Sequence, residues 1–339
     1  MTPTDLFPEM TPDAAATMLK AIDEQVSGVI VGQRDLIRSV LLCLLAEGHA
    51  LVEGVPGLGK TELLKALGTA CGLQYARVQF TPDLMPADIV GTQVLEDSAD
   101  GRRAFVFRPG PLFAGFVLAD EINRATPKTQ SALLEAMAER TITVAGSTRQ
   151  LPRPFLVMAT QNPIEMDGTY PLPEAQLDRF MMKALVPFPS SSDMLDILAR
   201  TTVGQRKTVQ SVSSPEQLQQ AVTLARSVPV TMHLGQHIVD LVMATQPTSS
   251  SAPESITKYV RVGGSPRAAQ SMMLAAKASA LLDGRPNVRV EDVRSIAPAV
   301  LRHRLITGYQ AAADGVTPDD LVAAVLEAVP TPAVAVRGT

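Results

Sequence analysis

The residues best suited to chemistry form the run Gly54-Val55-Pro56-Gly57-Leu58-Gly59-Lys60-Thr61, which matches the phosphate-binding pattern G-x-x-x-x-G-K-T. A short, mostly apolar stretch, residues 50–53, precedes it, and a segment with helical spacing, residues 62–67, follows it. This order lets backbone N–H groups surround phosphate oxygens at the positive end of a helix. We expect Lys60 to reach the β- and γ-phosphates and Thr61 to ligate Mg²⁺. The run therefore predicts binding of a nucleoside triphosphate.

Two acidic residues end a second apolar segment, in which Phe116–Asp120 is followed directly by Glu121. A strand here, in the same sheet, would deliver Asp120 to the Mg²⁺ beside Thr61. Adjacent side chains of a strand diverge, so Glu121 should contact a group other than the Mg²⁺ that Asp120 binds. Hydrolysis also requires an attacking water, which makes Glu121 the candidate general base that activates it. The alternative is a strand that ends in a solvated acidic turn.

A third apolar segment, residues 155–160, ends in the amides Gln161 and Asn162. A neutral amide at a strand tip can orient water against the γ-phosphate without adding charge. We expect Asn162 to fill this role, with Gln161 as the alternative. Because Asn-Pro is also a common turn starter, an ordinary turn is the competing interpretation.

Two arginines occupy positions that suit contact with an anion. Ser265 and Pro266 predict a helix start, which places Arg267 in the first turn, where a cation opposes the helix dipole by about 0.3–1 kcal/mol. An anion such as the γ-phosphate opposite Arg267 would offset that cost. Arg179 lies at a helix end before the last predicted core strand. It either caps that helix or projects into the nucleotide of a neighbouring subunit.

The elements that must position these residues alternate between strands and helices, which is typical of a mostly parallel sheet covered on both faces. The stretch 50–53 and four further segments, 75–80, 116–120, 155–160 and 184–188, are the predicted core strands. Two pairs of short segments flank turn residues and predict β-hairpins, at about 92–108 and 141–151. An irregular surface loop is the alternative for each.

The composition changes at residues 187–192, a stretch of Pro, Phe and Ser. Downstream, strand signals give way to helical ones. We therefore predict an αβα nucleotide-binding domain over residues 1–189, an all-helical lid domain over 190–329, and a tail over 330–339. The predicted lid helices cover residues 193–200, 215–228, 234–245, 265–282, 291–305 and 318–329.

Bulk properties exclude several classes of protein. A net charge of −4 over 339 residues gives no general attraction to nucleic acid or to anionic membranes. Two cysteines, Cys43 and Cys71, offer no disulfide framework. The first residues lack the pattern of a secretory signal. The longest strongly apolar run, residues 40–46, is far below the roughly 18 residues that span a bilayer. A cytoplasmic location is expected.

Taken together, the ordered set Gly54–Thr61, Asp120-Glu121, Asn162, Leu177–Phe180 and Gly264–Arg267 resembles an AAA+ ATPase. More specifically, the sequence is similar to the MoxR group over about residues 10–330. The short motifs that carry this similarity lie in residues 79–86, 110–112, 120–125, 159–163 and 172–180. The resemblance implies a five-stranded parallel core, two β-hairpin insertions and a C-terminal helical lid.

The same resemblance implies roles for individual residues. Asn162 corresponds to sensor 1, Arg267 to sensor 2 and Arg179 to the arginine finger, while Arg124 is a competing contact across the subunit interface. Lys60, Glu121, Asn162, Arg179 and Arg267 are thus the expected catalytic set, and Thr61 and Asp120 the expected Mg²⁺ ligands. The residues expected to bind ATP are Val31, Gly32, Gly54, Val55, Pro56, Gly57, Leu58, Gly59, Lys60, Thr61, Glu62 and Arg267.

The resemblance also implies a function: a ring, expected to be a hexamer, that couples ATP hydrolysis to maturation, assembly or cofactor insertion in partner proteins. A separate protein with a von Willebrand factor A domain is the expected partner. The alternative is a nucleic-acid motor, because helicase relatives carry the same insertions. The arginines that sustain this alternative lie on or near the predicted hairpins: Arg102, Arg103, Arg108, Arg140, Arg149 and Arg153.

Overall fold

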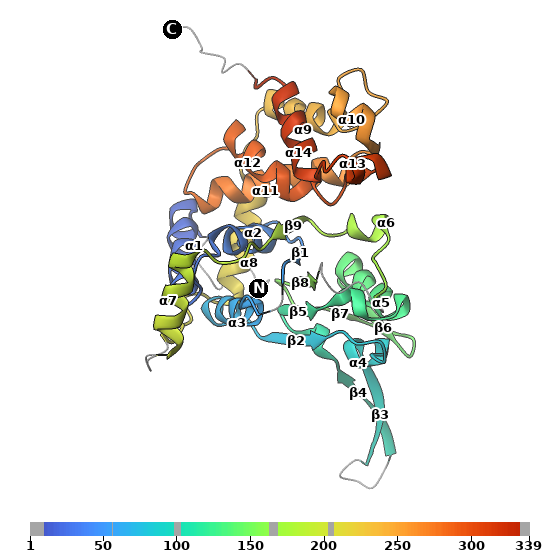
Figure 1. Cartoon of the computed structure of the whole chain (residues 1–339). Helices are drawn as coiled ribbons and strands as arrows, with labels where there is room; N and C mark the ends of the chain where they lie inside the picture. Colours follow the sequence, from blue (N-terminus) through green and yellow to red (C-terminus); the bar gives the residue numbers. More distant parts are fainter. Residues whose placement is uncertain (1–9, 56, 98–102, 163–168, 203–206, 333–339) are drawn as a thin grey trace.

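A five-stranded sheet lies at the centre of the chain, for which a computed structural model describes residues 10–55, 57–97, 103–162, 169–202 and 207–332. The strand order is β2-β5-β8-β1-β9, and every neighbouring pair is parallel (Figure 1). The strands are β1 (Ala50–Glu53), β2 (Tyr75–Gln79), β5 (Phe116–Asp120), β8 (Leu156–Gln161) and β9 (Met182–Leu185). The predicted sheet is confirmed. The bounds of β2 and β8 differ from the predicted ones by one residue. The strand β9 is displaced further, ending before Pro187 and Pro189, which cannot donate to a ladder.

Helices cover both faces of this sheet. Alternate residues of each central strand point to opposite faces: Leu118 joins one apolar core, while Val117 and Ala119 join the other. The first face carries α1 (Pro12–Ser27), α2 (Arg34–Leu45) and α3 (Lys60–Ala70). The second carries α4 (Pro86–Val90) and α5 (Pro127–Glu139). Short elements, namely the turns Pro111–Phe113 and Ile122–Arg124 and helix α6 (Glu174–Leu177), complete this half.

The region predicted as the lid, residues 190–329, is helical, as predicted, apart from one short pair of strands. Its helices are α7 (Ser191–Thr202), α8 (Pro215–Ser227), α9 (Met232–Ala244), α10 (Glu254–Tyr259), α11 (Pro266–Leu282), α12 (Val290–Leu301), α13 (Tyr309–Ala313) and α14 (Pro318–Ala328). The pair β10 (Val260–Val262) and β11 (Ile306–Thr307) is antiparallel. Strands of three and two residues are too short to give an alternating pattern, which is why the sequence predicted none.

The lid and the first face of the sheet share a single apolar core. Leu19 of α1 and Leu41 of α2 belong to the same buried cluster as Met272 of α11 and Val300 of α12. The central lid helix α11 therefore packs directly on the helices beside the sheet (Figure 1). Separating lid from sheet would expose this cluster, at about 25 cal/mol per Å² of apolar surface.

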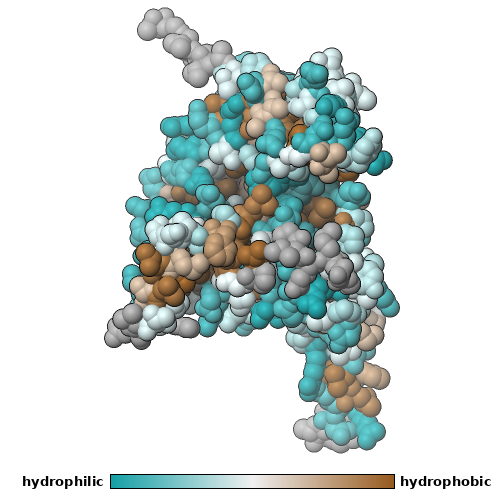
Figure 2. Space-filling model, in the orientation of Figure 1, coloured by the Kyte–Doolittle hydropathy of each residue, from teal (hydrophilic) through white to brown (hydrophobic). Residues whose placement is uncertain are grey.

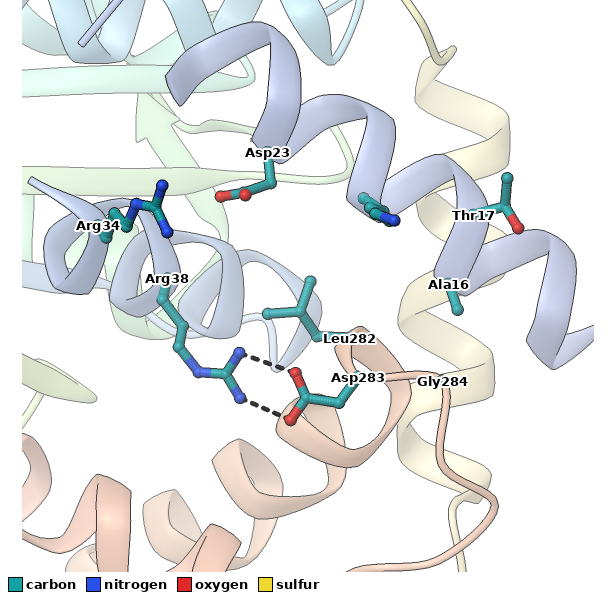
Figure 3. Close-up of a pocket in the computed structure, with 9 residues that line it drawn as sticks. Ala16, Thr17, Asp23, Arg34, Arg38, Leu282, Asp283 and Gly284 are labelled. Carbon is teal, nitrogen blue, oxygen red and sulfur yellow. Dashed lines mark hydrogen bonds and ion pairs between the residues drawn. The ribbon is translucent and has the colours of Figure 1, made fainter. Parts of the chain in front are cut away.

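The C-terminal end of α11 is tied to α2 by a paired arginine. Both terminal nitrogens of Arg38 lie 2.9 Å from the carboxylate oxygens of Asp283, and one also donates to Ser279. Figure 3 shows this pair at the edge of a cavity of about 490 Å³ between α1, α2 and the end of α11. Thus both a shared core and a bidentate ion pair hold the lid in place.

Two hairpins interrupt the sheet order, as predicted. The first pairs β3 (Gly91–Asp97) with β4 (Arg103–Pro109) and projects away from the body as an arm (Figure 1). The second pairs β6 (Thr141–Val144) with β7 (Ser147–Gln150). Figure 2 shows an apolar patch on the arm, where Phe105 is 71% exposed and lies opposite Leu95. No helix within the described part of the chain is long and apolar enough to cross a bilayer.

Candidate nucleotide-binding site

The predicted phosphate loop connects β1 to α3, as its motif requires. Gly57 and Gly59 both adopt left-handed backbone angles, with φ of 83° and 77°, a conformation that glycine adopts without strain. A Cβ at either position would have nothing within 4 Å, so both glycines border open space. Gly59 precedes α3 without a side-chain cap, which leaves the first helical N–H groups for another acceptor. Pro56 lies outside the described residues.

Lys60 bends back over its own loop. Its ammonium group donates to the carbonyl of Gly54 at 2.6 Å. Burial lowers the pKa of Lys60, and the nearby carboxylates of Asp120, Glu121 and Glu53 oppose that shift. These opposing contributions place the predicted lysine and both predicted acids in one electrostatic environment.

Asp120 stands at the C-terminal end of β5, between the ends of β2 and β8. The hydroxyl of Thr160 donates to one carboxylate oxygen at 2.6 Å. The guanidinium of Arg77 donates to the other at 2.7 Å and 3.2 Å. Sequence reasoning missed both partners. A charged residue within the apolar-flanked segment 75–80 was the available signal for Arg77.

Glu121 points to different partners, as the divergence of adjacent side chains predicts. Its backbone is left-handed, with φ of 56°, a rare state for a residue other than glycine that tends to occur at functional sites. Its N–H donates to the Thr160 hydroxyl at 2.9 Å. Its carboxylate accepts from Gln79 at 2.8 Å and from Arg124 at 3.0 Å. Gln79 was not among the predicted site residues.

The remaining predicted residues lie on two sides of this cluster. Asn162 directly follows β8, which lies between β5 and β1, and it is buried. Gly32 is left-handed, with φ of 72°, and a Cβ there would collide with Asp193. Gln33 donates to the carbonyl of Leu58, so the segment containing Val31 and Gly32 touches the phosphate loop. Glu62 is exposed in the first turn of α3.

Neither predicted anion-binding arginine contacts the phosphate loop within the described residues. Arg179 donates to the carbonyl of Leu134 inside α5, at 2.7 Å, rather than to the end of its own short helix. Arg267 lies in the first turn of α11, as predicted, and its guanidinium is 3.7 Å from the carboxylate of Asp178. The anion opposite Arg267 in this structure is therefore a carboxylate of the same chain.

The fold and the loop define a nucleotide-binding P-loop protein, and comparison with known proteins narrows the class. Residues 49–182 match the family model "ATPase family associated with various cellular activities (AAA)", and residues 254–325 match the model of the AAA lid domain. The crystal structure of a candidate ATPase from Cytophaga hutchinsonii superposes with a TM-score of 0.87 at 38% identity. That match covers 93% of this chain and 95% of the other.

Two curated relatives are similar over nearly the whole chain. Chaperone MoxR1 of Mycobacterium tuberculosis is 43% identical over 94% of this chain and 83% of its own length. Protein MoxR of Paracoccus denitrificans is 33% identical over 91% of this chain and 94% of its own length. The chain therefore belongs to the MoxR family of AAA ATPases.

Replacing Lys60 by Ala should weaken ATP binding by roughly 10- to 150-fold, because a hydrogen bond to a charged group is worth about 1.5–3 kcal/mol. Isothermal titration calorimetry of the purified protein with ATP measures the change. The matched control is Lys65→Ala, which removes an exposed ammonium group from the same helix and should leave the affinity within about twofold. Equal affinities for wild type and Lys60→Ala would show that ATP binds elsewhere.

Proposed function

We propose that this protein binds ATP with Mg²⁺ and hydrolyses it at the edge of the sheet where β1, β5 and β8 end. One observation carries the proposal: Lys60, at the start of α3, and the consecutive acids Asp120 and Glu121, at the end of β5, meet beside a glycine loop that opens onto free space. Lys60 would hold the phosphates, and Glu121 would accept a proton from the attacking water. Asn162, which follows β8 between β1 and β5, would orient that water.

The residues present fit a magnesium ion. Thr61 lies in the first turn of α3 and Asp120 ends β5, so together they offer the hydroxyl and carboxylate oxygens that Mg²⁺ prefers. Thr160 fixes one oxygen of Asp120, and the partner of the other, Arg77, is half-exposed. When bound, the ion would neutralise phosphate charge. The hydrogen bond from Thr160 would hold the Asp120 carboxylate in position for the ion.

We also propose that the active site is completed by a second copy of the chain, in a ring that the family resemblance suggests is hexameric. Arg179 is exposed and donates to its own α5 rather than to its own phosphate loop, which suits a contact across a subunit interface. Arg124 is the weaker candidate, because it already pairs with Glu121 of its own chain. An arginine supplied in this way stabilises charge in the transition state.

Replacing Glu121 by Gln should leave ATP binding near the wild-type value and slow hydrolysis by about 10²- to 10⁴-fold, because it removes the proton acceptor while preserving shape. Release of inorganic phosphate measures turnover, and calorimetry measures binding. Glu135→Gln, on the exposed face of α5, is the matched control. Turnover within twofold of wild type in Glu121→Gln would rule out this residue as the general base.

The function that we propose for the cycle is chaperone-like remodelling of partner proteins, including a separate protein with a von Willebrand factor A domain. The partner class comes from the family resemblance, and the docking element from the structure. The arm formed by β3 and β4 presents exposed Leu95 and Phe105. Its base is joined to the second hairpin, because Arg149 stacks over the ring of Phe107 at 4.0 Å. In the chain, β5 follows the first hairpin and β8 follows the second, so a movement of these strand ends with nucleotide state would reach both hairpins.

The arginines near the hairpins favour a protein partner over a nucleic acid. Arg103 pairs with Asp97, and Arg108 pairs with Glu96, on the arm itself. Arg140 pairs with Glu47. Because neighbouring carboxylates compensate these charges, the described part of the arm, residues 91–97 and 103–109, lacks the uncompensated basic surface that phosphate contacts require.

A double replacement, Leu95→Ser with Phe105→Ser, should reduce capture of such a partner by about tenfold or more, because it removes the exposed apolar side chains. Wild-type protein should also capture more partner with ATP than with ADP, by the 1–3 kcal/mol usual for such coupling. Pull-downs in a Glu121→Gln background with ATP measure the first effect. Tyr309→Ser, at a lid residue that is 90% exposed, is the control. Unchanged capture by the double variant would exclude the arm as the docking element.

A further inference from the structure

Arg304 of the lid is buried at the junction with the sheet and contacts the segment that contains Arg179. Its side chain is only 2% exposed. Its guanidinium donates to the carboxylate of Asp178 at 2.8 Å and to the carbonyls of Phe180 and Met181 at 2.7 Å and 3.0 Å. These acceptors lie on both sides of Arg179 in the sequence. One buried side chain therefore fixes the backbone that carries the proposed arginine finger.

Asp178 is held a second time, from the start of α11. The hydroxyl of Ser265 donates to its carboxylate oxygens at 3.0 Å and 2.9 Å. Arg267, two residues further on, approaches the same carboxylate at 3.7 Å but is 58% exposed. The buried Arg304 contact is thus fixed, whereas the Arg267 contact is solvated and weak. Arg267 can leave for a phosphate while Asp178 keeps its other two partners.

The neighbouring residues explain why this contact is rigid. The ring Nε2 of His303 lies 3.1 Å from the carbonyl oxygen of Phe180. The backbone N–H of Met181 donates to the carbonyl of His49, just before β1. The lid and the first face of the sheet share one apolar core. The Arg179 segment is therefore held between β1 and the end of α12, with few degrees of freedom left to its backbone.

We propose that Arg304 and Asp178 are positioning residues that orient Arg179 for catalysis in the neighbouring subunit, and that Asp178 links this arginine to Arg267, which serves the subunit's own nucleotide. The inference rests on the proposed trans role of Arg179. A planar guanidinium that donates to several groups at once, as that of Arg304 does, cannot be replaced by an ammonium group without loss of geometry. Small displacements of a catalytic group lower the rate strongly even when substrate binding is intact.

Mixed assemblies separate this role from effects within one subunit. Lys60→Ala chains lack a working nucleotide loop but retain Arg179, and Arg179→Ala chains retain the loop but lack the arginine. Mixing them should restore activity only at sites formed by the loop of one chain and the arginine of the other. We call the Lys60→Ala chain the donor and the Arg179→Ala chain the acceptor.

Adding Arg304→Lys to the donor should lower the restored kcat between about tenfold and a hundredfold, and leave the KM for ATP within about twofold, because the acceptor's nucleotide loop is unchanged. The matched control is Arg302→Lys in the donor. Arg302 is a lid arginine at the same junction that contacts Asp319 and the carbonyl of Lys183 but not Asp178. It should leave the restored kcat within about twofold.

Adding Ser265→Ala to the Lys60→Ala chain gives a milder second test, because it removes one hydrogen bond to Asp178 and leaves Arg304 buried and paired. It should lower the restored kcat in the same direction, by about threefold to tenfold. Sedimentation of the mixtures checks that each donor assembles with the acceptor. Restored kcat unchanged by both Arg304→Lys and Ser265→Ala would overturn the positioning role. Absence of any restored activity with the unmodified donor, in assemblies that form, would instead reject the trans role of Arg179 and this inference with it.

Discussion

The parallel pairing of β1, β5 and β8 is the constraint on which the site depends. Strands that run in one direction place their carboxyl ends along one edge of the sheet. The phosphate loop after β1, the acids at the end of β5 and the amides after β8 therefore converge, although about a hundred residues separate the first from the last. The hydroxyl of Thr160 joins two of these strand ends directly, through its hydrogen bonds with Asp120 and with the N–H of Glu121.

The lid adds a second constraint. Because the lid shares an apolar core with α1 and α2, it is held firmly against the sheet domain rather than tethered loosely to it. Its central helix is held at one end by Asp178 and at the other by Arg38. Burying Arg304 at the junction of lid and sheet would be costly without partners. Its hydrogen bonds to the Asp178 carboxylate and to the carbonyl of Phe180 offset that cost. The same contacts that stabilise the junction thus determine where Arg179 lies.

Local sequence patterns predicted most of this architecture, and the site residues that they missed share one physical cause. The phosphate loop, the four N-terminal core strands, both hairpins and the helix start at Ser265 follow from nearest neighbours in the chain. Arg77 and Gln79 were missed as site residues because their contacts depend on the register between β2 and β5. Arg304 was missed because its partner, Asp178, is 126 residues away. Such pairings are set by packing, which a local pattern does not report.

The central claim, that each active site is built from two copies of the chain, can be tested on the wild-type protein alone. Specific ATPase activity should be measured over a dilution series, with the assembled fraction determined by sedimentation at each concentration. The account predicts that activity per chain falls in proportion to the assembled fraction. The dissociated chain should be slower by about 10³-fold or more, since it lacks the neighbour's arginine. Full activity per chain in the dissociated state would contradict the account.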